Sequence, residues 1–97
     1  MKAILITYNQ AYYDDVVAVL NRNGVKGYTE WDEIKGHGSD MGEPHLGSHA
    51  WPTLNNTIIS IVEDDRVEGV LSDLHERDFK APELGLRAFV WNIEKMI

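Results

Sequence analysis

Apolar runs and polar breaks divide the first third of the chain into strand, helix and strand. The continuous apolar stretch within residues 2–8 predicts a strand that is covered on both faces and is therefore central in its sheet. Asn9 is a helix-capping residue type. The segment after it has apolar side chains at i, i+4 and i+8, namely Tyr12, Val16 and Leu20. This spacing predicts a helix over 10–23, and the pair Asn23-Gly24 is a typical helix stop. Aromatic and β-branched residues then predict a second strand over 25–34.

The second half of the chain again reads as strand, helix and strand. Residues 56–62 are mostly β-branched and predict a third strand. Asp64 or Asp65 can cap a second helix that ends near Arg77. The apolar positions of this helix are Val67, Val70, Leu71 and Leu74. A polar turn follows, and the alternation of residues 86–93 predicts a fourth strand.

The predicted order β-α-β-β-α-β specifies one α+β domain over residues 1–97. It is ferredoxin-like, with a four-stranded antiparallel sheet and two helices on one face. Two helices cover only one face of such a sheet, so the other face must be solvated or buried by another subunit. The chain also has more aromatic bulk than so small a core requires: Tyr28, Trp31, Trp51, Phe89 and Trp91. These two observations predict a homo-oligomer.

A long segment between the second and third strands has no hydrophobic periodicity. Residues 36–49 contain four glycines and one proline, which favours an irregular loop that extends over about 36–55. Loops of this length are uncommon in compact domains and are often functional. The loop is therefore the most informative segment of the chain.

Composition and charge disfavour several classes of function. Nine Lys and Arg against sixteen Asp and Glu give a net charge of −7, so the chain has no general attraction to the phosphates of nucleic acids. Its apolar runs are far shorter than the roughly 20 residues that span a bilayer, and we expect no membrane insertion. The lack of cysteine excludes disulfides and thiolate chemistry and fits a cytoplasmic location. Ser48-His49 is the nearest approach to a nucleophile and base, and since adjacent side chains rarely point at one another, we do not expect an enzyme.

Three short motifs, in their order and spacing, resemble the PII family of signal-transduction proteins. They are Asn-Gly-Val-Lys-Gly-Tyr-Thr at 23–29, Ile-Lys-Gly-His-Gly at 34–38 and Ala-Phe-Val at 88–90, after a first strand that begins Met-Lys. The resemblance spans nearly the whole chain. It implies a homotrimer that binds adenine nucleotides (ATP, ADP or AMP) in clefts between subunits. It also implies that the long loop contacts a target enzyme or membrane transporter, which makes the protein regulatory.

The same resemblance implies roles for individual residues. The adenine side of the cleft would be lined by Gly27, Tyr28 and Thr29. The phosphates would be faced by Gly36, His37 and Gly38 at the base of the loop, and by Gly85 and Arg87 near the last strand. Such roles are physically reasonable, because glycine lets backbone N–H groups approach an anion closely and a threonine hydroxyl can bond an adenine edge.

The chain departs from the family pattern on the phosphate side. The family's turn of the kind Thr-Gly-x-x-Gly-Asp-Gly-Lys is replaced by Lys-Ala-Pro-Glu-Leu-Gly-Leu-Arg at 80–87. The C-terminal arginines that complete the family's phosphate site have no counterpart before Ile97, and Asp40 stands where the family has a glutamine. These departures predict that nucleotide binding is weakened, altered or lost. The loop also has no tyrosine, so the uridylylation that some members undergo has no acceptor there.

The loop carries candidate ligands for a divalent transition metal. His37, His45 and His49 lie in it with Asp40 and Glu43, and imidazole with carboxylate suits zinc, copper or nickel. Histidines in a glycine-rich loop are more often solvated or packed against a partner. Two alternatives to a nucleotide sensor are therefore a metal-binding or metal-tolerance protein of the CutA type, which shares the fold and the trimer, and a scaffold without a ligand.

Overall fold

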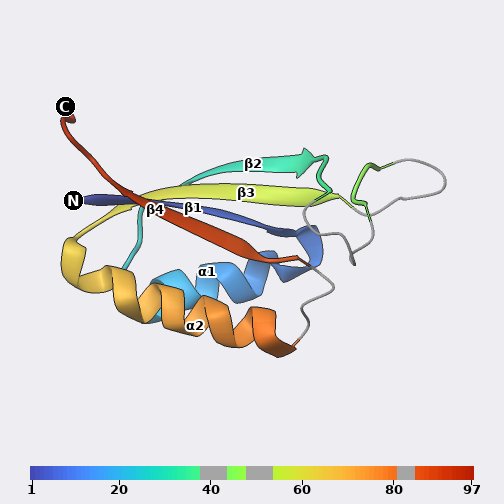
Figure 1. The fold of residues 1–97 in the computed structure, drawn as a ribbon, viewed down its shortest axis with the longest axis horizontal. Coiled ribbons are helices and arrows are strands. Elements are labelled where there is room, and N and C mark those ends of the chain that lie inside the picture. The colour runs from blue at the N-terminus through green and yellow to red at the C-terminus, as the bar shows by residue number, and fades with distance from the viewer. Residues whose placement is uncertain (38–43, 48–53, 81–84) are drawn as a thin grey trace.

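Four strands and two helices follow one another along the chain in the predicted order β-α-β-β-α-β (Figure 1). The computed structural model describes residues 1–37, 44–47, 54–80 and 85–97. The strands are β1 (Lys2–Asn9), β2 (Thr29–Ile34), β3 (Asn55–Val62) and β4 (Arg87–Asn92). The helices are α1 (Tyr13–Arg22), which follows the 3-10 turn η1 (Gln10–Tyr12), and α2 (Val67–Lys80), which follows the 3-10 turn η2 (Asp64–Arg66).

The strands form one antiparallel sheet in the order β2-β3-β1-β4, and both helices pack on the same face of it (Figure 1). β1 pairs with β3 from Lys2 opposite Val62 to Asn9 opposite Asn55, and its other edge pairs with β4. The central position of the first strand and the α+β, ferredoxin-like fold are thereby confirmed. Within the described ranges, no helix is long and apolar enough to cross a membrane.

The end of α1 explains why β2 begins later than predicted. Gly24 has φ +75°, and its N–H donates to the Asn21 carbonyl at 3.0 Å, while the Val25 N–H donates to the Leu20 carbonyl at 2.9 Å. These two bonds form a Schellman motif, in which glycine adopts the left-handed conformation without the Cβ penalty. Val25 is buried in the core directly after this turn, and β2 starts only at Thr29.

The two helical segments begin in different ways. The side-chain oxygen of Asn9 accepts a hydrogen bond from the Ala11 N–H at 2.9 Å, which confirms the predicted cap. The prediction that Asp64 or Asp65 caps the second helix is wrong, because Glu63 occupies the cap position without a side-chain capping bond. Asp64 instead pairs with the N-terminal amine at 2.9 Å, and this hydrogen bond holds the pKa of the Asp64 carboxyl below its ordinary value.

One apolar core fills the space between the sheet and the helices. α2 contributes Val67, Val70 and Leu74 to the core and continues to Lys80, beyond the predicted end near Arg77. Alternate positions of the strands and one stripe of each helix face this core. The apolar side chains with at most 1% exposure that fill it are Ile4, Ile6, Tyr8, Val16, Val19, Leu20, Ile58, Val70 and Leu74.

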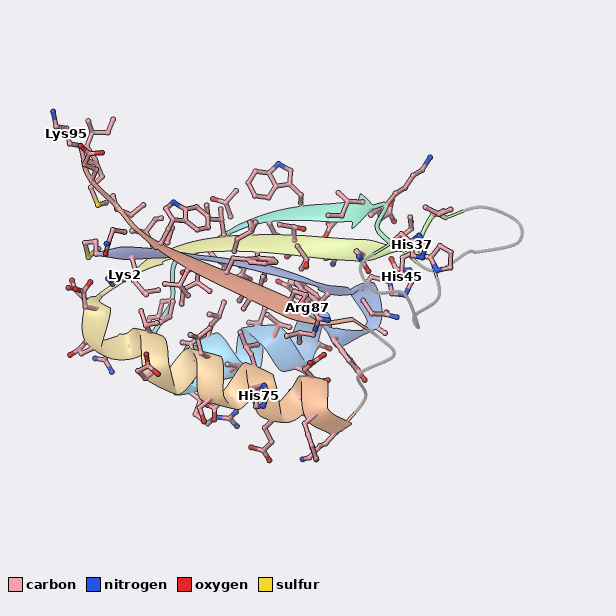
Figure 2. All side chains as sticks on the ribbon, in the orientation of Figure 1. Lys2, His37, His45, His75, Arg87 and Lys95 are labelled. Carbon is pink, nitrogen blue, oxygen red and sulfur yellow. The ribbon has the colours of Figure 1, made fainter. Side chains whose placement is uncertain are left out.

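The opposite, open face of the sheet carries large apolar side chains. Their exposed fractions are 50% for Trp31, 53% for Phe89, 45% for Trp91 and 37% for Ile61. They share a face because side chains alternate along strands: Trp91 and Ile61 both pair with Ala3 of β1. Figure 2 shows ring side chains on the side of the sheet away from the helices. The predicted surplus of aromatic side chains is thus found at the surface, and Trp51 lies outside the described residues.

Candidate functional site

The predicted adenine-side residues lie together at the start of β2. They border an open pocket of about 340 Å³ that is lined by Gly27, Tyr28, Thr29, Ile59 and Ile61. The Ser60 hydroxyl donates to the Gly27 carbonyl at 2.6 Å and holds the backbone of this segment against β3. Apolar side chains beside a threonine hydroxyl and backbone polar groups suit a flat ring with polar edges.

Tyr28 connects this pocket to α1. Its hydroxyl oxygen lies 2.8 Å from the hydroxyl oxygen of Tyr13. The hydrogen bond, together with burial, raises the pKa of Tyr13 to about 12. Tyr13 therefore stays neutral near physiological pH, and the pair ties the rim of the pocket to the first turn of α1. Sequence reasoning did not single out Tyr13, because its partner is fifteen residues away in the chain.

Gly36 and His45 close the base of the long loop. The Gly36 N–H donates to the His45 carbonyl at 2.7 Å, and the His45 N–H donates to the Gly36 carbonyl at 2.6 Å. His45 is 6% exposed, and its Nδ1 is hydrogen-bonded to the side-chain oxygen of Asn55. A side chain at position 36 would overlap the amide nitrogen of Asn55. Gly36 thus has a packing reason to be glycine, since only then can the two sides of the loop meet beside Asn55.

The predicted metal ligands lie in different environments. His45 is buried against Asn55, whereas His37 is exposed; Figure 2 shows both near the base of the loop. His49 lies outside the described residues, as does Gly38 of the predicted phosphate-facing group. Among the residues that the structure describes, no three His, Cys, Asp or Glu side chains are grouped so that they could hold a metal ion. Metal binding by the loop histidines stays a prediction.

Asn56, next to Asn55 at the start of β3, organises the end of β2. Its side-chain oxygen accepts a hydrogen bond from the Glu33 N–H at 3.1 Å, and its side-chain amide donates to Glu30 at 3.0 Å. Glu33 has φ +55°, and the register of β2 on β3 is irregular around it. Asn56 therefore supports the backbone that leads into the loop. The available sequence signal was two adjacent asparagines at the start of a strand that is otherwise mostly β-branched.

The remaining predicted phosphate-side residues flank the start of β4. Gly85 has φ +72°. Arg87 donates to the Leu86 carbonyl at 3.2 Å and pairs with Asp78 of α2 at 3.5 Å. It borders a pocket of about 460 Å³ between α2 and β4. Arg87 is thus engaged with α2, and residues 81–84 of the altered turn lie outside the described residues.

Within a single chain, the predicted adenine-side residues and the predicted phosphate-side residues lie apart. Gly27, Tyr28 and Thr29 precede or begin β2, whereas Gly36 follows its end. The two groups lie at opposite ends of β2, whose six residues span roughly 16 Å at the rise of an extended strand. In the register of the sheet, Arg87 of β4 stands opposite Thr7 of β1, near the end of the sheet from which the long loop extends. Figure 2 shows Arg87 on β4.

Comparison with known proteins agrees with this architecture. The sequence profile of the family described as nitrogen regulatory protein P-II matches residues 1–97. The structure of CPII from Thiomonas intermedia K12 bound to ADP and bicarbonate is 27% identical, with a TM-score of 0.78 over 95% of this chain and 84% of that one. Another CPII structure, bound to ADP, AMP and bicarbonate, is 26% identical in sequence, with a TM-score of 0.75, and the match covers 95% of this chain and 88% of that one. A protein from Thermus thermophilus that is described as a PII-like signaling protein is 25% identical in sequence, with a TM-score of 0.69, and the match covers 95% of this chain and 85% of that one. A comparison with curated protein sequences returned no match.

The profile match covers the full length of the chain, and the solved structures share its fold. The resemblance predicted from the three motifs is confirmed. The chain belongs to the nitrogen regulatory protein P-II family.

Proposed function

We propose that this chain is a trimeric regulatory protein that senses an adenine nucleotide in clefts between subunits. It acts on a target enzyme or transporter through the loop at about 36–55. The observation that carries the proposal is the pocket at Gly27, Tyr28 and Thr29, in a chain whose structural neighbours include CPII bound to ADP and AMP. The family is described as regulatory, which supports a non-enzymatic role. The proposed location is the cytoplasm, which the lack of cysteine fits.

The open face of the sheet supports the trimer. Its large apolar side chains remain 37–53% exposed in a single chain. Burial of this apolar surface against neighbouring chains would stabilise the assembly by about 25 cal/mol for each Å² removed from water. The separation of the two groups of nucleotide residues along β2 supports clefts between subunits, since a second chain can bring its loop base to the pocket of the first.

The phosphate side supports only modest affinity. The glycine-rich turn of the family is missing, and Arg87 would have to exchange its contact with Asp78 for a phosphate. A charge-assisted hydrogen bond contributes roughly 1.5–3 kcal/mol, so the loss of two or three such bonds costs several powers of ten in affinity. We therefore expect weaker nucleotide binding than in relatives with the full turn.

The CutA-type alternative has less support. The matching profile is that of the P-II family, and the similar solved structures quoted above are PII-like proteins. The ring of His45 is buried and already bonded to Asn55 through Nδ1. A transition metal at His45 would have to bind the other ring nitrogen or displace Asn55.

Calorimetric titration with ATP, ADP and AMP tests the proposal, on protein whose oligomeric state is measured by light scattering. We expect at least one nucleotide to bind a trimer with one site per chain. Thr29→Val should weaken binding by about tenfold, which corresponds to roughly 1.4 kcal/mol for one lost hydrogen bond. Thr29→Ser keeps the hydroxyl and is the matched control, which should bind nearly as the wild type does. A trimer that binds none of the three nucleotides would contradict the sensor, and a monomer would contradict the clefts.

A further inference from the structure

The side chain of Arg87 leaves the face of the sheet on which its strand places it. Arg87 stands two residues before Phe89, which lies on the open face, and one residue after Leu86, which is buried in the core. Because side chains alternate along a strand, Arg87 belongs to the open face. Its guanidinium group nevertheless reaches Asp78 of α2, on the helix side, at 3.5 Å. β4 is an edge strand of the sheet, so the long side chain can pass around that edge.

Asp78 depends on this contact for charge compensation. It lies in the last turn of α2, where the helix dipole disfavours a carboxylate. Its side chain is 21% exposed, and its Oδ1 is buried without a hydrogen-bond partner among the residues that the structure describes. The two bases of the same turn, Arg77 and Lys80, pair with other acids. Within the described part of the chain, Arg87 is therefore the base that Asp78 pairs with.

A phosphate can replace Asp78 as the partner of Arg87. The Arg87 side chain is 49% exposed and borders, with Asp78, the pocket of about 460 Å³ between α2 and β4. An ion pair with this much exposure contributes little to stability, because water and salt screen it. The guanidinium group binds carboxylates and phosphates through the same N–H donors. The two kinds of acceptor therefore compete for one group.

We propose that Asp78 is an internal competitor for Arg87 and thereby sets the affinity of the nucleotide site. This role rests on the proposed function, because it takes the phosphates of the nucleotide as the alternative partner of Arg87. In the observed arrangement, Asp78 holds the guanidinium group against α2. Nucleotide binding draws that group away and leaves the carboxylate of Asp78 without its partner. Asp78 thus raises the nucleotide concentration at which the site fills.

Calorimetric titration of the full chain with ATP tests the competition. Asp78→Asn keeps the shape of the side chain and removes its charge. We expect ATP to bind this variant about fivefold more tightly than the wild type, which corresponds to about 1 kcal/mol. A residue that only supported the structure would give a loss of affinity on substitution instead of this gain.

Glu76→Gln is the matched control for net charge. Glu76 is 68% exposed near the end of α2, and its printed partner is Lys80, so the variant removes one negative charge without touching Arg87. It should bind ATP as the wild type does. An equal gain in Glu76→Gln and Asp78→Asn would overturn the proposal, because the gain would then come from the lower net charge.

A double-mutant cycle with Arg87→Gln identifies the group that Asp78 acts on. In the Arg87→Gln background, Asp78→Asn should leave ATP affinity unchanged, because no guanidinium group remains to be released. A gain that persists in this background would mean that Asp78 acts on the nucleotide directly, and it would contradict the competition. Equal ATP binding by the wild type and Asp78→Asn would also overturn the proposal, while nucleotide sensing would stand.

Inorganic tripolyphosphate, which has no adenine and no ribose, separates this proposal from the proposed function. We expect tripolyphosphate also to bind Asp78→Asn more tightly than the wild type. If no nucleotide binds either protein and tripolyphosphate still shows this difference, the adenine sensor fails and the competition for Arg87 stands. If tripolyphosphate then binds both proteins equally, or binds neither, the competition is overturned as well.

Discussion

Asn55 holds His45 at the neck of the long loop, which is the point where the backbones of Gly36 and His45 pair. Its side-chain oxygen is hydrogen-bonded to Nδ1 of the buried His45 ring. The two residues are ten positions apart, and Asn55 is the first residue of β3. The rigid end of a sheet strand therefore carries the returning segment of the loop. This contact gives His45 a structural role that its position in a glycine-rich loop does not reveal.

Gly36→Ala should open this neck. The added methyl group overlaps the Asn55 amide, while both backbone bonds between Gly36 and His45 depend on the close approach. We expect hydrogen exchange of the amides at 36 and 45 to accelerate by about tenfold, as a loss of about 1.4 kcal/mol of local stability produces. Gly27→Ala is the control, because nothing lies within 4 Å of its added Cβ. Unchanged exchange in Gly36→Ala would show that Asn55 yields without opening the neck.

Gly69→Ala should destabilise the fold although alanine favours helices. Helix propensity alone predicts a gain of about 1 kcal/mol. The new methyl group would, however, overlap the side-chain oxygen of Asn23, which is held by hydrogen bonds from its amide to Val19 and Asp73 at 2.8 and 2.9 Å. Overpacking of this kind costs about 1–3 kcal/mol. Urea unfolding should show that Gly69→Ala lowers the free energy of unfolding in the wild-type background and raises it in the Asn23→Ala background. An increase in both backgrounds would mean that the Asn23 side chain moves aside freely.

Phe89→Lys should weaken self-association. Phe89 lies on the open face of the sheet opposite Leu5 and is 53% exposed in a single chain, so a charge there would have to be buried in the trimer. Phe79→Lys, at a 79% exposed position on α2, is the control on the other side of the molecule. Light scattering should report about three times 11.0 kDa for the wild type and Phe79→Lys, and a smaller mass for Phe89→Lys. Equal masses for the two variants would place the interface elsewhere.

Glu30→Gln should alter the pH dependence of stability in a defined direction. The pKa of Glu30 is about 7 in the folded chain and about 4.3 in an unfolded one, so the folded state binds more protons between these values. This contribution to stability is complete below about pH 4 and is lost as the pH rises through about 7. Glutamine does not titrate, so urea unfolding at about pH 5 and about pH 8 should show a smaller decline for the variant. Parallel declines would mean that Glu30 has an ordinary pKa.

Local patterns predicted the elements well and some of their ends poorly. The Asn23-Gly24 stop was correct because a Schellman turn is built from neighbouring residues. The start of β2 was placed four residues early, since an apolar Val25 reads the same whether it enters the core or begins a strand. The expected cap at Asp64 failed because the helical segment begins one residue earlier, so that Glu63 takes the cap position and Asp64 lies in the first turn.

By itself, the sequence determined the order of strands and helices, the single α+β domain and the family, because these depend on short-range periodicity and on motifs read along the chain. Only the tertiary structure decided that Asn56 of β3 donates to Glu30 of β2, that Tyr13 of α1 bonds to Tyr28, and that Asn55 closes the loop on His45. These contacts depend on the register of β2 against β3 and on the packing of α1 beneath them. No local pattern encodes that register, because it is set by how one buried core satisfies all four strands at once.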